Sequence, residues 1–144
     1  MTKQFRKAWL VVALVLGAAV VAQADEPDKL FVSVTSEDRQ TQGFSMILAT
    51  RAMEQGQEPR ILLCGPGAEM ALRDYDAEPL EPAGANPQQM MQNLINEGVT
   101  VEVCAIFLPN TEHTEDDLID GVAVASVEDI AAYMADPEVR YFSN

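Results

Sequence analysis

The chain has 144 residues, of which 48% are hydrophobic and 22% are charged, and its 9 basic and 23 acidic side chains give a formal net charge of −14. This hydrophobic fraction is typical of a globular domain rather than a disordered chain. The negative charge repels nucleic acid and anionic lipid, so neither is an expected partner.

The first 24 residues have the three-part layout of a secretory signal peptide. Three basic residues precede an apolar run from Ala8 to Ala22, and Ala22-Gln23-Ala24 forms a small-x-small cleavage site. The apolar run is shorter than the roughly 20 residues of a membrane-spanning helix. We therefore expect export to a bacterial periplasm, cleavage after Ala24 and no membrane attachment afterwards. Residues 25–144 are then expected to form a single domain with 6 basic and 23 acidic residues, a net charge of −17.

Apolar runs and chain breakers alternate through the rest of the sequence. In chain order we expect a strand at residues 29–35, a helix at 41–55, a buried strand at 60–64, a short helix at 68–74, a loop at 78–87, a helix from 87 to a stop at Gly98, a strand at 101–108, a short helix at 114–119, a strand at 122–125, a helix at 126–135 and a strand at 138–142. Strands separated by helices pair in parallel and place helices on both faces of the sheet. The sequence thus predicts a three-layer α/β domain, flavodoxin-like or Rossmann-like, with a mostly parallel sheet of about five strands.

Two of the expected helices carry methionine on their apolar side. In the helix at 41–55 the apolar stripe contains Met46, Ile47 and Met53, and in the helix that follows Pro87 it contains Met90 and Met91. Such stripes are more often core than contact surface, and we expect core packing for both. A subunit contact through Met90 and Met91 is the alternative.

Ligands and reactive groups of parallel α/β domains gather at the carboxyl ends of the strands. Residues 35–42, 64–68 and 104–113 follow such ends in the predicted sheet. None of these segments contains a glycine-rich phosphate cradle, and the Gly65-Pro66-Gly67 turn has no lysine after it, so a nucleotide site is not expected. His113, the only histidine, lies among exposed acids without the ligand spacing of a calcium loop. We expect no metal site and no organic cofactor.

Cys64 and Cys104 are the only cysteines. Cys64 ends a short apolar run, and Cys104 lies within the apolar run of residues 101–108. In a strand, Cys104 would share its face with Thr100 and Glu102, which is the more polar side. Three interpretations stay open. Cys104 is a reactive thiol, a small buried hydrophobe, or one half of a disulfide with Cys64, which neighbouring parallel strands and an oxidising compartment would permit.

From about Leu30 to Phe142 the chain resembles the DsrE/DsrF-like sulfur-relay family. The resemblance rests on Gln42-Gly43 at the start of the first helix, the NEGV sequence of residues 96–99, the VEVCAIFL strand of residues 101–108, and the DGVAVASVEDIAAYM segment followed by EVRYF. It implies that Cys104 accepts sulfane sulfur as a persulfide, with Cys64 as a candidate auxiliary or resolving thiol. The implied activity is that of a sulfurtransferase or sulfur carrier. Its implied partners are a small sulfur compound or a partner-protein thiol, and its implied assembly is a homo-oligomer, a trimer or a hexamer.

Two other functions fit the same residues. The acidic stretch after Cys104, where relay members have basic residues, favours a non-catalytic periplasmic binding or assembly domain that keeps the fold, with Cys64 and Cys104 structural. A thiol-disulfide protein is the third candidate, although the chain has no C-x-x-C motif.

Overall fold

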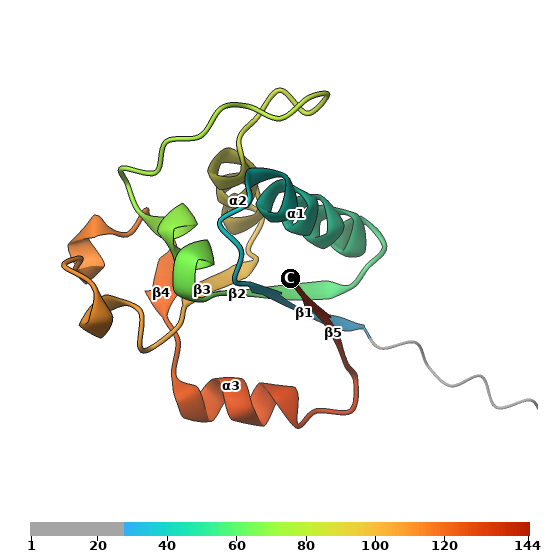
Figure 1. Ribbon diagram of the computed structural model, residues 1–144. Helices are drawn as coiled ribbons and strands as arrows, with labels where there is room; N and C mark the ends of the chain where they lie inside the picture. The colour runs from blue at the N-terminus through green and yellow to red at the C-terminus, as the bar shows by residue number, and fades with distance from the viewer. Residues whose placement is uncertain (1–27) are drawn as a thin grey trace, which may run out of the picture.

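The computed structural model describes residues 28–144, so the predicted signal peptide lies outside the described residues. Strands and helices alternate along the chain (Figure 1). The strands are β1 (Lys29–Val34), β2 (Glu58–Leu63), β3 (Thr100–Val103), β4 (Val122–Val124) and β5 (Val139–Ser143). The α-helices are α1 (Arg39–Glu54), α2 (Pro87–Asn96) and α3 (Val127–Met134), and the 3-10 helices are η1 (Gly65–Ala71), η2 (Leu108–Asn110) and η3 (Glu115–Asp117).

The five strands form one parallel sheet in the order β4-β3-β2-β1-β5. This confirms the predicted α/β architecture with its mostly parallel sheet. The first strand of the described residues is therefore not at an edge, because β1 pairs with β2 on one side and with β5 on the other. Parallel pairing brings the carboxyl ends of all five strands to one edge of the sheet.

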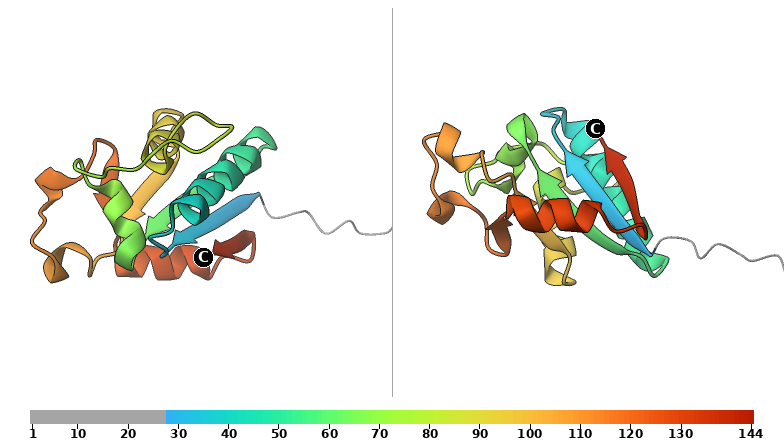
Figure 2. Two further views of the ribbon diagram at one scale, coloured as in Figure 1. Left: turned by 45° about the horizontal axis from the view of Figure 1, so that its top comes forward. Right: turned by 90° about the horizontal axis from the view of Figure 1, so that it is seen from below.

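Helices cover the two faces of the sheet unequally (Figure 1). Helices α1 and α2 lie on one face, where they enclose the main core around Val32, Met46, Leu63 and Met91. Within residues 28–144, the other face carries only α3, which crosses it as the second view of Figure 2 shows. No residue of α3 is fully buried, and the core beneath it is small, made of Phe31, Leu62, Ala125 and Val139. One face of the sheet is thus thickly covered and the other thinly.

The predicted helix stripes are confirmed except at one position. Met46 and Met91 are completely buried, and Met53 and Met90 pack against the same core. Ile47 was placed in the apolar stripe but is 42% exposed, because α1 turns that side away from the sheet and toward solvent. The ends of the helices follow their caps: Asp38 caps α1, and Asn86 forms a capping box with Gln89 at the start of α2.

The predicted strand over residues 101–108 is wrong in its second half. Strand β3 ends at Val103, and the backbone N–H of Phe107 donates to the carbonyl oxygen of Cys104 at 2.8 Å, which turns the chain. The turn directs Phe107 back into the main core, where it is buried. Burial of this aromatic ring offsets the loss of strand pairing, which an apolar sequence alone does not reveal.

The short helices expected at residues 68–74 and 114–119 are 3-10 helices instead, η1 (Gly65–Ala71) and η3 (Glu115–Asp117). Within residues 28–144, no helix is both long and apolar enough to cross a membrane.

Candidate functional site

Segments that follow β1, β2 and β3 meet at the carboxyl edge of the sheet, as predicted. The backbone N–H of Cys64 donates to the carbonyl of Val34 at 2.9 Å, and the N–H of Cys104 donates to the carbonyl of Leu63 at 2.8 Å. These bonds extend the parallel pairing by one residue beyond β2 and β3. Both cysteines therefore lie directly at the ends of neighbouring strands.

Cys64 and Cys104 are joined by a disulfide, with their Cα atoms 5.1 Å apart. This separation is within the usual range for a disulfide. The bond spans 40 residues of sequence and links the ends of β2 and β3. Of the interpretations left open by the sequence, the structure contains the bridged form, and no free cysteine is present among residues 28–144. Both cysteines are only half-buried, so the sulfur atoms are not sealed in the core.

Gly67 brings the chain after Cys64 close to the end of β1. A Cβ atom at this position would meet the carbonyl oxygen of Val34 at 2.4 Å, and the Gly67 N–H donates to the carbonyl of Thr35 at 3.2 Å. Only glycine permits this approach without a backbone shift. The predicted Gly65-Pro66-Gly67 turn thus starts η1 and fixes the path of the chain after the cysteine.

A small apolar hollow lies beside Cys104 on the thinly covered side of the sheet. Its volume is about 230 Å³, and apart from Cys104 it is lined by Leu62, Ala105, Ile106, Ala125, Val127 and Ile130. None of these side chains is ionisable. We call it the apolar hollow. Cys104 shares its face of β3 with Glu102, as expected, but α3 and the 104–107 turn also bring apolar side chains to it.

Glu102, two residues before Cys104, is largely buried on the same side of β3 and paired with Arg60 of β2. The Arg60 guanidinium donates to Glu102 through two nitrogens, at 2.7 and 2.8 Å. It also lies over the Tyr133 ring of α3, 5.0 Å from the ring centre. The only carboxylate on this stretch of β3 is thereby neutralised by an adjacent cation, which limits its repulsion of a Cys104 thiolate.

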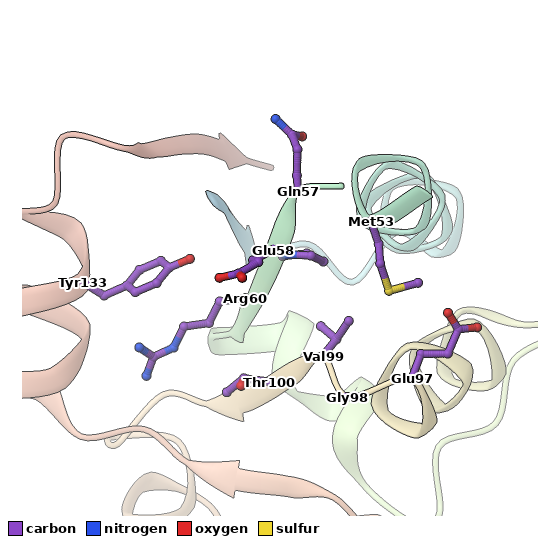
Figure 3. A pocket seen from close by; sticks show the side chains of 10 residues that line it. Met53, Gln57, Glu58, Arg60, Glu97, Gly98, Val99, Thr100 and Tyr133 are labelled. Carbon is purple, nitrogen blue, oxygen red and sulfur yellow. The ribbon is translucent and has the colours of Figure 1, made fainter. Parts of the chain in front are cut away.

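Arg60 and Tyr133 also line a second hollow, which lies at the amino ends of β2 and β3 (Figure 3). Glu58 and Thr100, at the starts of these strands, line it as well. Because the cysteines are at the opposite ends of the same strands, this hollow is not part of the cysteine site.

His113 lies apart from the cysteines, in a hollow lined with acidic residues, including Glu37, Glu69 and Asp74. The loop around it is held by its own side chains. Backbone and side-chain hydrogen bonds from Thr114 hold the pKa of Asp117 below its ordinary value of 3.8. In the described part of the chain, no group of three or more His, Cys, Asp or Glu side chains is arranged to hold a metal ion.

Sequence reasoning placed Cys64 and Cys104 at the correct edge but missed the residues around them. Ile106 and Val127, the most exposed members of the apolar hollow at 71% and 63%, come from segments on either side of β4. The nearest signal in the sequence was the apolar run that continues past Cys104, which was assigned to the strand.

These features define a class of protein: a parallel α/β domain with a thiol pair at the carboxyl edge of its sheet. A family model described as the DsrE/DsrF-like family matches residues 28–142. The chain belongs to the DsrE/DsrF-like family, as the sequence resemblance indicated. No curated protein matches the chain.

Two solved structures have the same fold. The ychN protein from E. coli matches with a TM-score of 0.67 and 21% sequence identity, over 81% of this chain and 98% of that chain. MTH1491 from Methanobacterium thermoautotrophicum, described as a protein of unknown function, matches with a TM-score of 0.57 and 21% identity over the same shares of the two chains. At this level of identity the similarity concerns the fold.

Proposed function

We propose that this protein accepts and passes on sulfane sulfur through a persulfide on Cys104. The observation that carries the proposal is the position of Cys104: it follows β3 at the carboxyl edge of a DsrE/DsrF-like sheet, half-buried beside an open hollow. A second thiol, Cys64, is adjacent. Membership of this family supports a sulfur-relay role in general.

The chemistry requires a thiolate and no metal or organic cofactor. The Cys104 thiolate attacks the outer sulfur of a donor, the S–S bond of the donor breaks, and the donor keeps the electron pair as its leaving group. Cys104 then carries the transferred sulfur as Cys–S–SH. In the second half of the cycle an acceptor thiolate attacks that outer sulfur, and Cys104 leaves as a thiolate.

The Cys64–Cys104 disulfide is, on this proposal, the oxidised resting form. Bridged cysteines cannot attack a donor, so a dithiol reductant must first open the bond by thiol-disulfide exchange. Cys64 then serves as an auxiliary thiol. If it attacks the inner sulfur of the Cys104 persulfide, the disulfide re-forms and hydrogen sulfide leaves.

Intact mass spectrometry tests the proposal directly. The protein is reduced, freed of reductant and exposed to polysulfide, together with Cys64→Ser and Cys104→Ser variants. We expect a lasting gain of whole sulfur atoms in Cys64→Ser and none in Cys104→Ser. Wild type should gain sulfur first and then lose it as Cys64 re-forms the disulfide. Equal uptake by Cys104→Ser would exclude Cys104 as the acceptor.

The disulfide itself favours a second candidate function, a non-catalytic binding or assembly domain in which both cysteines are structural. This candidate predicts that the bridge resists a dithiol at concentrations that open exposed disulfides. It also predicts that polysulfide adds no mass to the reduced protein. Cycling of the two cysteines between bridged and free forms without sulfur uptake would instead identify a thiol-disulfide protein.

We further propose export to the periplasm and self-association into trimers or hexamers. Export is supported by the layout of residues 1–24 and self-association by family membership. The N-terminal sequence of the protein recovered from cells tests cleavage after Ala24. Light scattering of the purified protein tests the assembly, and a monomer at micromolar concentration would contradict it.

A further inference from the structure

The apolar hollow beside Cys104 has a composition that restricts what it can bind. Its wall is hydrocarbon from Leu62, Ala125 and Ile130, and its rim is formed by the exposed Ile106 and Val127. Cys104 is the only lining residue able to form a covalent bond with a ligand. With a volume of about 230 Å³, the hollow is suited to one small molecule rather than a folded partner.

Charge around the hollow disfavours an anion. The chain has a formal net charge of −14, and no lining residue is cationic. The adjacent amino end of α3 offers little compensation, because Glu128 and Asp129 occupy its first turn and already complement the helix dipole. The Ser126 hydroxyl oxygen accepts the Asp129 N–H at 3.2 Å and so caps the same end. An anionic donor such as thiosulfate would lose hydration here without gaining a charged partner.

We propose that the apolar hollow is the donor-binding site and that it selects an uncharged, apolar sulfane-sulfur compound, of which cyclo-octasulfur is the simplest, over anionic donors. This inference rests on the proposed function. The Cys104 thiolate attacks one sulfur of the ring, and one ring S–S bond breaks. The electron pair goes to the far end of the opened chain, which stays bonded to Cys104. Atoms and electrons balance without any further oxidant or reductant.

The test compares two substitutions that add the same charge to the same helix. Val127→Glu puts a carboxylate on the rim of the hollow, while Met134→Glu puts one at the other end of α3, outside the hollow. Both side chains are exposed, at 63% and 48%, so neither variant is expected to unfold. Each is reduced and exposed to cyclo-octasulfur or to thiosulfate, and sulfur on Cys104 is followed by intact mass.

We expect wild type to take up sulfur from cyclo-octasulfur faster than from thiosulfate. Val127→Glu should slow uptake from cyclo-octasulfur by roughly tenfold, about 1.4 kcal/mol in the barrier. Met134→Glu should remain within about twofold of wild type. Circular dichroism and urea midpoints of both variants serve as the folding control.

Two results would overturn the inference while leaving persulfide chemistry at Cys104 intact. These are preferential uptake from thiosulfate and equal effects of the two substitutions. Uptake that persists in Cys104→Ser would instead contradict the proposed function itself. The two failures are therefore distinguishable in one set of measurements.

Discussion

At the scale of single residues, we expect the Arg60–Glu102 ion pair to affect Cys104, because Glu102 lies two residues before it in the chain. Their side chains are only 18% and 11% exposed, and they lie on the side of the sheet that Cys104 faces. Replacing Arg60 with Met leaves a largely buried carboxylate unpaired two residues from the thiol. Loss of one partner from a buried pair costs about 3–5 kcal/mol.

We therefore expect Arg60→Met to lower the free energy of unfolding by less than this, about 1–3 kcal/mol, because both groups keep some contact with solvent, and to slow thiol modification of reduced Cys104. Urea unfolding and the reaction rate with an uncharged dipyridyl disulfide, in the Cys64→Ser background, measure the two effects. The double variant Arg60→Met, Glu102→Leu is the control and should recover most of both losses. A single variant as stable as wild type would rule out a role for this ion pair.

Prediction from sequence succeeded for residues whose role depends on their own element and failed for roles that depend on neighbours. Cys104 was placed at the edge of the sheet because its apolar run predicts a strand. Whether it meets Cys64 depends on β2 and β3 being adjacent, which the order of strands along the chain does not fix. Likewise, Ile106 and Val127 share a hollow only because the chain turns after β3.

At the scale of elements, the Lys29–Asp136 ion pair connects the start of β1 to the turn before β5. The Lys29 ammonium donates to Asp136 at 2.7 Å and lies 3.6 Å from Glu138. The hydrogen bond to Asp136 raises the pKa of Lys29 above 10.5. The same bond, with the backbone N–H of Glu138, holds the pKa of Asp136 below 3.8. The Asp136 contribution to stability is present above pH 3.8 and is lost as the pH falls through the pKa of Asp136 in the folded protein. The Lys29 contribution is present below pH 10.5 and is lost as the pH rises through the pKa of Lys29 in the folded protein.

Asp136→Asn should therefore remove part of the acid sensitivity of the fold. Between about pH 6 and about pH 3, the urea midpoint of wild type should fall further than that of the variant. Glu138→Gln is the matched control, because its carboxylate lies farther from Lys29 and it should behave like wild type. If the urea midpoints of wild type and Asp136→Asn fell equally as the pH is lowered, the Lys29–Asp136 pair would be excluded as an acid-sensitive contact.

Helices were predictable where the spacing of apolar residues and the helix-capping residues indicate the same boundaries. The apolar stripe, Asn86 and Pro87 correctly indicated α2, and Ser126 correctly indicated the start of α3. The errors concern short segments, η1 and η3, and the end of β3. In each of these, tertiary contacts such as the burial of Phe107 decide the conformation over a few residues, and local pattern has little weight.

At the scale of the whole molecule, the disulfide closes a loop that contains η1 and α2. For a sequence separation of 40, the chain-entropy model gives a stabilisation of about 4 kcal/mol. We expect a dithiol reductant to lower the free energy of unfolding of wild type by about this amount, measured by urea unfolding. The variant with both cysteines replaced by serine should not respond to reductant. An unchanged wild type would mean that the cysteines are not bridged in solution.

The same estimate links redox state to function. If sulfur uptake requires free thiols, the working form is the less stable one. While the Cys64–Cys104 disulfide is intact, the protein would be protected against unfolding, and a reductant would convert it to the form that takes up sulfur.

The order of strands in the sheet has a consequence for folding during synthesis. Because β1 lies between β2 and β5, the earliest strand keeps one edge unpaired until residues 139–143 have emerged. Asn144 then bonds to the backbone of Ser33 and Thr35 and completes that edge. Until then, the open edge of β1 is available for pairing with another copy of the chain. Pairing with β5 thus closes the free edge of β1, and the time for which this edge stays open during synthesis depends on the length of chain between the two strands.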